Sequence, residues 1–386
     1  MEDGSTSTLI EGLLNRVSVL EPGPMQQVAD AVMAANARAA EAELRAAMLR
    51  SQAVSLNWLP RLGPNVSLTS LGSVVTSLVL DQAIIDHGTR AAERDFARAD
   101  VEVAATRLAE DSNARVLTAL ELYLRAEAAR ARAAISADGM AEIAHFTWIM
   151  TERVNAGVSD RADLQVVTQR RDQLLADLAA DREQASTALA ELQAMAASPL
   201  DAVSGLSGIA SPSATALPLT VMRAEAEGRR AVAAARAARA GYLPGLSASG
   251  DLTGDGVGLR IAAPNGVGFG TGAAIAAAEA EAAAIEARLV QEREQAARDI
   301  AALQGRLTAL RRQEGEAQAL ARAAADNYTL FAAQQRAGQR SVPETVSVFE
   351  TRLRAERAAV EIGYEIAVLE LRIAARLGAL VDGEAI

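Results

Sequence analysis

The residues that could carry out chemistry are few in this 386-residue chain, and they form no catalytic set. There are two histidines, His87 and His145, and no cysteine. Without cysteine there are no thiolate nucleophiles, disulfides or thiolate metal sites, and two distant histidines do not make a histidine-based metal site. We therefore expect no enzyme activity, no metal and no cofactor.

One glycine-rich segment, GVGFGTG at residues 266–272, superficially resembles a phosphate-binding loop. It lacks the lysine and Ser/Thr that follow such loops, and no βαβ unit surrounds it. His87 precedes Gly88 and is expected in a turn, while Trp148 is expected to pack between helices. None of these positions predicts a ligand site.

The composition favours closely packed helices over a compact globular core. Hydrophobic residues make up 50% of the chain, but alanine dominates them and aromatic residues are only 3%. Alanine-rich cores are typical of helices that approach closely in coiled coils and bundles. The net charge of −11, with arginines scattered among acids, excludes a nucleic-acid-binding protein.

The sequence shows neither a membrane-spanning helix nor a recognisable signal peptide. No run of about 18 apolar residues predicts a membrane-spanning helix. The start, MEDGSTSTLIEG, lacks the basic and apolar regions of a signal peptide. Either the chain stays in the cytoplasm, or an export signal has been removed from it.

The same arrangement of residues occurs twice along the chain. Leu59 and Leu243 each precede a proline, and the interval between them equals the interval between Gly88 and Gly272. Further on, NAGVSDRADLQVV is echoed by RAGQRSVPETVSV. This self-similarity indicates a duplicated half-protein. We expect an N-terminal tail at 1–24 with little regular structure, a first repeat at 25–196, a linker at 197–218 and a second repeat at 219–380.

Each repeat is expected to contain a helix, a β-hairpin and a long antiparallel helical hairpin. The predicted ranges in the first repeat are helix 25–56, hairpin 62–85, long helix 86–155, a tip turn near Gly157 and returning helix 161–196. In the second they are helix 219–240, hairpin 246–264, long helix 269–336, a tip turn near Gly338 and returning helix 343–378. The fold class is thus mainly α with a small β part.

The two predicted hairpins alternate apolar and polar residues, so each has one apolar and one polar face. Asp81, Asp251 and Arg260 fall on the polar faces. Such a hairpin can lie on a soluble core, where these residues are merely exposed. It can equally place its apolar face against lipid and its polar face toward the lumen of a β-barrel. The segment between each Leu-Pro pair and the next matching glycine is short and equal in both copies, which leaves strands near the membrane-spanning minimum.

Neither part is expected to be stable in a single copy. A helix of about 65 residues is roughly 100 Å long and needs neighbours along its length. An isolated two-stranded hairpin is marginal in water, and its edges are intolerable in lipid. A trimer solves both problems, because four strands per chain make a twelve-stranded barrel and the helices close into a tube.

The chain resembles the TolC family of trimeric outer-membrane efflux and secretion channels. The resemblance rests on the duplicated order, on LVLDQAIIDHGTRAAERDFARA at the strand-to-helix passage, and on the two tip segments quoted above. It implies an exit duct that runs from the periplasm to the exterior and performs no chemistry. It also implies a homotrimer in outer-membrane lipid, whose helical tube in the periplasm docks an adaptor (membrane fusion) protein and an inner-membrane pump.

The resemblance also implies roles at the helical tips, which turn at Gly157 and Gly338. An acid and an arginine hold the mouth of the resembled channels shut, and Asp163 and Arg340 match them by position. Glu344 matches one ring of acids at the constriction. The second ring falls on Ser347, so that ring is missing or displaced here, and strong cation selectivity is in doubt.

Two other classes of protein remain as alternatives. A periplasmic adaptor needs one helical hairpin within domains rich in strands, whereas this chain predicts two helical hairpins and few strands. A soluble coiled-coil scaffold has no need of alternating strands or of an internal duplication. Both alternatives are therefore less consistent with the sequence than a channel.

Overall fold

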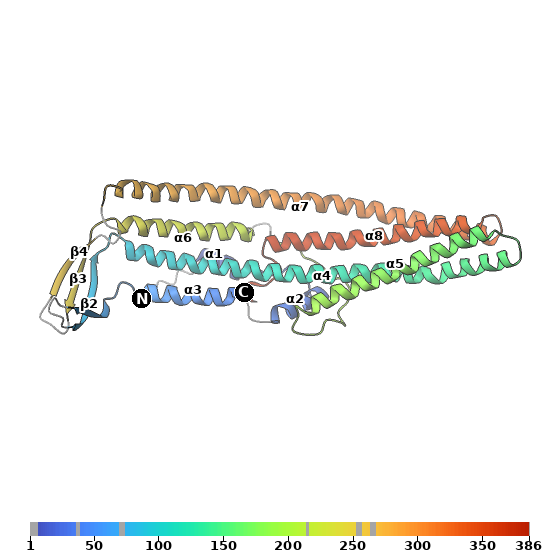
Figure 1. The fold of residues 1–386 in the computed structure, drawn as a ribbon. Helices are drawn as coiled ribbons and strands as arrows, with labels where there is room; N and C mark the ends of the chain where they lie inside the picture. The colour runs from blue at the N-terminus through green and yellow to red at the C-terminus, as the bar shows by residue number, and fades with distance from the viewer. Residues whose placement is uncertain are drawn as a thin grey trace.

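The computed structural model describes residues 7–35, 39–68, 74–213, 216–251, 257–262 and 268–385. The molecule is elongated, with a four-stranded sheet at one end and two helical turns at the other (Figure 1). Helices fill the length between these ends. The expectation of a mainly helical chain with few strands is confirmed.

Two long helices run from the sheet toward the tips. Helix α4 (Thr89–Asn155) has 67 residues and α7 (Thr271–Arg336) has 66, so each is about 100 Å long. Helices α5 (Arg161–Gln193) and α8 (Val342–Arg376) return from the tips. The turns contain Gly157 (φ +71°) and Gly338 (φ +75°), a left-handed conformation that glycine adopts without a Cβ clash.

The strands form one antiparallel sheet in the order β1-β2-β3-β4. These are β1 (Arg61–Leu68), β2 (Val74–Ile85), β3 (Gly245–Asp251) and β4 (Val257–Ala262). The two hairpins do not stand apart, because β2 pairs with β3 and so joins the two repeats. The predicted turns near Gly72 and at Asp255–Gly256 lie outside the described residues.

The N-terminal region is more ordered than expected. Residues predicted as an irregular tail include helix α1 (Thr8–Leu14), which Ser7 caps by accepting a hydrogen bond from the Leu9 backbone N–H. Leu9 and Leu13 are buried in a cluster that includes Val103 and Met222, and this packing stabilises so short a helix. The tail prediction is thus wrong for residues 8–14.

The remaining short helices lie along α4. The helix predicted at 25–56 is divided into α2 (Pro24–Ala34) and α3 (Ala39–Ser55), and residues 36–38 lie outside the described part. Its counterpart in the second repeat is one helix, α6 (Leu219–Gly241). The predicted linker contains no helix in its described residues, but Ile209 forms a β-bridge with Leu20. A short 3₁₀ turn, Gly383–Ala385, follows α8.

Helix α4 is the centre of the core and α7 lies at its margin. Helices α2, α3, α5, α6 and α8 all pack against α4, whereas α7 packs against α6 and α8. The main cluster joins Val28 of α2, Tyr123 of α4 and Leu371 of α8, and thus both repeats. Of α7 only Ala296, Leu310, Ala324 and Tyr328 are buried, so one chain leaves most of this long helix uncovered.

None of the helices in the described ranges combines the length and apolar character that a membrane-spanning helix requires.

Candidate functional site

The first tip is the turn between α4 and α5. Asp160 is the N-cap of α5, and its side chain accepts a hydrogen bond from the Ala162 backbone N–H at 3.2 Å. Asp163 lies in the first turn of the helix and is exposed. A carboxylate is favoured there by the positive end of the helix dipole, so its position needs no partner in the same chain.

The second tip carries a capping box at the start of α8. The Ser341 hydroxyl accepts a hydrogen bond from the Glu344 backbone N–H at 3.4 Å, and the Glu344 carboxylate accepts one from the Ser341 backbone N–H at 3.1 Å. The hydrogen bond from the Ser341 backbone N–H, followed by that of the Ser341 side chain, lowers the pKa of the exposed Glu344 carboxyl, because both stabilise its charged form. Glu344 therefore has a local structural role beside the one expected at a constriction.

Arg340 is held against its own tip. Its Nε donates to the Gln334 Oε1 at 3.1 Å, and its guanidinium lies 4.6 Å from the centre of the Phe331 ring. Within one chain, no ion pair in the described ranges joins Arg340 to Asp163. A link between these two residues would have to form between subunits, and it stays a prediction.

Directly behind the tips, an aromatic cluster ties helices of both repeats together. The ring centres of Phe146 and Phe349 lie 6.3 Å apart, and those of Tyr328 and Phe349 lie 5.5 Å apart. Gly139 of α4 makes this packing close, because a Cβ there would lie 3.0 Å from Leu353 and 3.1 Å from Phe349. The helices are thus tightly packed against one another next to the tips.

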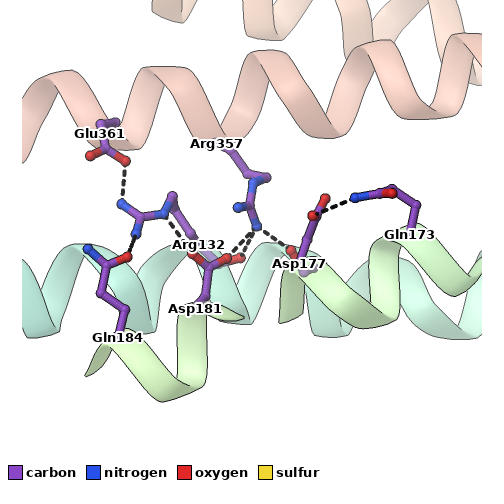
Figure 2. A network of polar contacts seen from close by, with 8 residues as sticks. Arg132, Gln173, Asp177, Asp181, Gln184, Arg357 and Glu361 are labelled. Carbon is purple, nitrogen blue, oxygen red and sulfur yellow. Dashed lines mark hydrogen bonds and ion pairs between the residues drawn. The ribbon is translucent and has the colours of Figure 1, made fainter. Parts of the chain in front are cut away.

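A network of charged side chains lies further along the same helices and joins three of them (Figure 2). Arg132 of α4 donates from Nε to Asp181 of α5 at 2.9 Å and also pairs with Glu361 of α8. Arg357 of α8 lies 2.6 Å from the other oxygen of Asp181. Gln184 accepts a further hydrogen bond from Arg132 at 2.7 Å. The network therefore connects the returning helices of both repeats.

Burial makes this network sensitive to the loss of any one member. Asp181 and Arg132 are only 5% and 9% exposed. Burial by itself would lower the pKa of Arg132, but the hydrogen bond to Asp181 and the charges of Glu361 and Asp181 outweigh it, and the pKa rises. The guanidinium stays charged, and its stability in the core depends on its acidic partners.

Sequence reasoning missed this network, although a signal for it was present. Asp181 lies on the buried face of α5 between Leu178 and Ala185, at the spacing of the core residues. A charge in a helical apolar stripe requires a partner on a facing helix. Naming Arg132 and Arg357 as those partners requires the packing of α4 and α8, which the sequence of α5 alone does not contain.

The sheet places the three predicted lumen residues on a common face. Asp81 lies opposite Arg61 and Ser249 in the strand register. The position of Asp251 is two residues from Ser249 on β3, and that of Arg260 is opposite Ser247. Directly opposite and alternate positions share a face of a sheet. All three predicted positions are therefore on the face that carries Arg61.

The other face of the sheet is apolar and open. Leu62 lies opposite Leu80, and their side chains are 58% and 38% exposed. Ile261 of β4 occupies the same face and is 75% exposed. An exposed apolar face backed by a polar one is what a barrel strand presents to lipid and to a water-filled lumen.

The expectation for His87 agrees with the structure, whereas the expectation for Trp148 does not. His87 lies in a turn as expected, with φ +50° and its ring Nε2 3.0 Å from the Pro244 carbonyl oxygen. Trp148 is 60% exposed in one chain and stacks on His145, with ring centres 5.9 Å apart. The expected packing of Trp148 between helices is therefore not found within one chain.

No protein-family model matches the chain, and no curated protein matches it by sequence. Solved structures do match it closely in fold. A membrane protein from Pseudomonas aeruginosa has a TM-score of 0.80 and 18% identity, over 96% of this chain and 93% of that one. The Campylobacter jejuni CmeC outer membrane channel has a TM-score of 0.75 and 15% identity, over 92% and 86% of the two chains.

A third match is the open state of the Neisseria gonorrhoeae MtrE outer membrane channel, with a TM-score of 0.69 and 18% identity, over 95% of this chain and 93% of that one. These structures are similar in fold along nearly the whole length of this chain. The chain has the fold of the TolC-like outer-membrane channels.

Proposed function

We propose that the chain is one subunit of a homotrimeric outer-membrane channel, which serves as the exit duct of a tripartite efflux pump or a type I secretion system. The observation that carries this proposal is the sheet at one end of a helical body about 100 Å long. It has an exposed apolar face, a face of polar positions, and two edges, β1 and β4, that pair with nothing in the described chain.

The open edges support closure with other copies. In lipid, unpaired backbone N–H and C=O groups have no water to satisfy them, so a spanning sheet must close on itself. Four strands are too few for a barrel, but three copies supply twelve. The apolar residues Leu62, Leu80 and Ile261 would then face lipid, and Asp81, Asp251 and Arg260 would line the lumen.

The opposite end supports a gate. Asp163, Arg340 and Glu344 are exposed charged residues at the tips, next to turns at Gly157 and Gly338. An ion pair between Asp163 of one subunit and Arg340 of the next would contribute about 1 kcal/mol or less. Three such links would close the mouth weakly, which suits a mouth that has to open. One structural neighbour is itself described as an open state.

A conduit of this kind needs partners and no catalytic residues. The duct would be passive, and the tips would dock a periplasmic adaptor protein that connects them to an inner-membrane pump. Outer-membrane lipid would surround the strands, and the helical tube would lie in the periplasm. The structural neighbours are channels and not enzymes, which agrees with this assignment.

The assembly state tests the proposal. The full chain, directed to the outer membrane by an added export signal, should be extracted only with detergent and should have the mass of three copies by native mass spectrometry. It should run as a heat-resistant trimer on gels. A monodisperse monomer that remains in solution without detergent would contradict the proposal and would favour a coiled-coil scaffold.

A further inference from the structure

The duplicated helices α4 and α7 are equivalent in sequence position but differ in what covers them. Near the sheet, the helices pack in the order α3, α4, α6, α7, so α4 has a neighbour on both sides and α7 has one. Figure 1 shows α3 and α7 on opposite sides of the pair formed by α4 and α6. The α4–α6 junction joins the first repeat to the second, and within the described chain no equivalent junction covers α7.

One ion pair lies at the α4–α6 junction, which is the inner junction between the two repeats of one chain. The Nη1 atom of Arg229 in α6 lies 3.0 Å and 3.1 Å from the two carboxylate oxygens of Glu102 in α4. Glu102 is only 8% exposed. Arg229 precedes the second Leu-Pro pair along the chain, and Glu102 follows Gly88 at the start of its long helix.

The same two residue types recur at the equivalent positions of the other halves. Arg45 of α3 stands as far before Leu59 as Arg229 stands before Leu243. Glu286 of α7 likewise stands as far after Gly272 as Glu102 stands after Gly88. The side chains of Arg45 and Glu286 are both exposed. Neither forms an ion pair within one chain in the described ranges, and α3 and α7 lie too far apart to join them there.

Exposed apolar residues lie near Arg45 and Glu286 along the chain. Their equivalents in the other repeat are buried at the α4–α6 junction. Leu49 of α3 and Leu56, just after that helix, are 60% and 57% exposed. Their equivalents in the second repeat, Ala233 and Ala240 of α6, are 3% and 6% exposed. Val290 of α7 is likewise 60% exposed. These exposed positions thus carry larger apolar side chains than a solvated helix face needs.

A second ion pair of the α4–α6 junction has neither of its charges at the equivalent positions of α3 and α7. Arg230 of α6 lies 3.0 Å from Asp100 of α4. The residues at the equivalent positions are Ala46 in α3 and Ala284 in α7. Loss of one charge alone would leave the other unpaired in a contact, whereas loss of both allows the helices to pack.

A third ion pair of the α4–α6 junction has only its acid at the equivalent positions, and this acid meets no second acid there. Arg223 of α6 pairs with Glu110 of α4 at 2.8 Å. The equivalent positions hold Ala39 and Glu294, and Glu294 already pairs with Arg298 of its own helix at 2.9 Å. No equivalent position in this series brings two like charges together.

We propose that α7 of one subunit packs against α3 of the next as α4 packs against α6 within a chain, and that Glu286 pairs with Arg45 of the partner subunit. This contact is head to tail, and such contacts generate rings when the rotation closes. It would bring strand β4 to strand β1 of the next copy, as β2 meets β3 within one chain. The inference rests on the proposed trimeric channel and names its subunit interface.

Chemical cross-linking tests this contact directly, because the chain has no native cysteine. Arg45→Cys and Glu286→Cys are combined in the full-length protein in outer membranes and treated with a short bismaleimide. The expected result is a ladder of covalent dimer and trimer on denaturing gels, absent in either single variant. The matched control combines Glu102→Cys with Arg229→Cys, whose cross-link lies within one chain and gives no ladder.

Reversal of the charges gives an independent readout. Arg45→Glu places two acids at the contact and is expected to weaken each of the three subunit contacts roughly fivefold, and thus to lower the yield of trimer, because about one surface ion pair is lost per contact. Arg45→Glu combined with Glu286→Arg should restore it. A trimer of normal yield that neither cross-links at these cysteines nor responds to the reversal would overturn the interface and leave the channel standing. A chain that is monomeric in membranes and in detergent would overturn the channel itself.

Discussion

The Nε atom of Arg132 lies 2.9 Å from the Oδ1 atom of Asp181, and this buried pair fastens α4 to α5. Arg357 of α8 reaches the second oxygen of the same carboxylate at 2.6 Å. One carboxylate thus pairs with two arginines that belong to different repeats. The returning helices of both tips are tied to α4 at this point. Movement of the tips is therefore expected to pivot between this network and the tip turns.

Asp181→Asn should destabilise the protein strongly. The substitution removes the negative charge between two guanidinium groups, and breaking a buried pair in this way costs about 3–5 kcal/mol. The matched control is Asp177→Asn, one turn earlier on α5, where the carboxylate accepts a hydrogen bond from Gln173 at 3.0 Å. Its effect should stay within about 0.5 kcal/mol. Thermal and urea unfolding measure both, and equal losses in the two variants would show that the network is not a key element of the core.

Leu80→Arg should prevent membrane assembly, whereas Val79→Arg should not. These neighbours lie on opposite faces of β2, Leu80 with the apolar Leu62 and Val79 on the face that carries Asp81. Arginine on a lipid-facing strand position costs about 2–4 kcal/mol near the bilayer midplane, but on a lumen-facing position it stays in water. The yield of trimer in outer-membrane fractions measures the difference. Equal yields from both variants would place the apolar face elsewhere.

Arg340→Ala should raise the conductance of the closed channel. If the arginine acts through Asp163 of the next subunit, Asp163→Ala should have the same effect, and the exchange Arg340→Asp with Asp163→Arg should restore the low conductance. Gln334→Ala is the matched control, because it removes only the partner of Arg340 in its own chain. Single-channel recording measures all four variants. A rise with Gln334→Ala as large as that with Arg340→Ala would assign the effect to the tip itself.

Glu344 should keep its charge in mild acid. The hydrogen bonds with Ser341 lower the pKa of its carboxyl, so it remains ionised as the pH falls through the ordinary glutamate value of about 4.3. Its stabilising contribution to the tip is present above that value and is lost only as the pH falls through the lower value of the folded state.

The reversal potential in a salt gradient measures this charge. If Glu344 lines the constriction, the preference for cations should persist to a lower pH than an ordinary glutamate would allow, and Glu344→Gln should reduce it at pH 7. Glu365→Gln, on the same helix about six turns away, should leave it unchanged. An equal effect of the two variants would mean that Glu344 serves only as a helix cap.

Much of the architecture was predictable because it depends on local and repeated signals. The Leu-Pro pairs, the glycines at 88, 157, 272 and 338 and the alternating strands mark boundaries that nothing distant has to correct. Helix α1 was not predictable, because a seven-residue helix exists only through the burial of Leu9 and Leu13. The pairing of β2 with β3 was also missed, since residues from different repeats meet there.

The candidate site divides in the same way. Asp81, Asp251 and Arg260 were assigned to polar strand faces from alternation alone, and the register brings their positions onto one face. The contacts of Arg340 with Phe331 and Gln334 depend on how the tip turn folds, which its sequence does not reveal. The partners of Asp181 depend on packing between helices that are far apart along the chain.

The central claim, that this chain forms a pore, is tested most directly by ion conduction through the purified oligomer. Detergent-extracted protein, added to a planar lipid bilayer, should produce discrete and equal current steps. The steps should grow when Arg340→Ala removes the proposed link between Arg340 and Asp163 of the next subunit. Detergent alone and the Leu80→Arg variant should produce none. If folded trimers of both the unaltered chain and the Arg340→Ala variant insert into the bilayer and carry no current, the chain is not a channel.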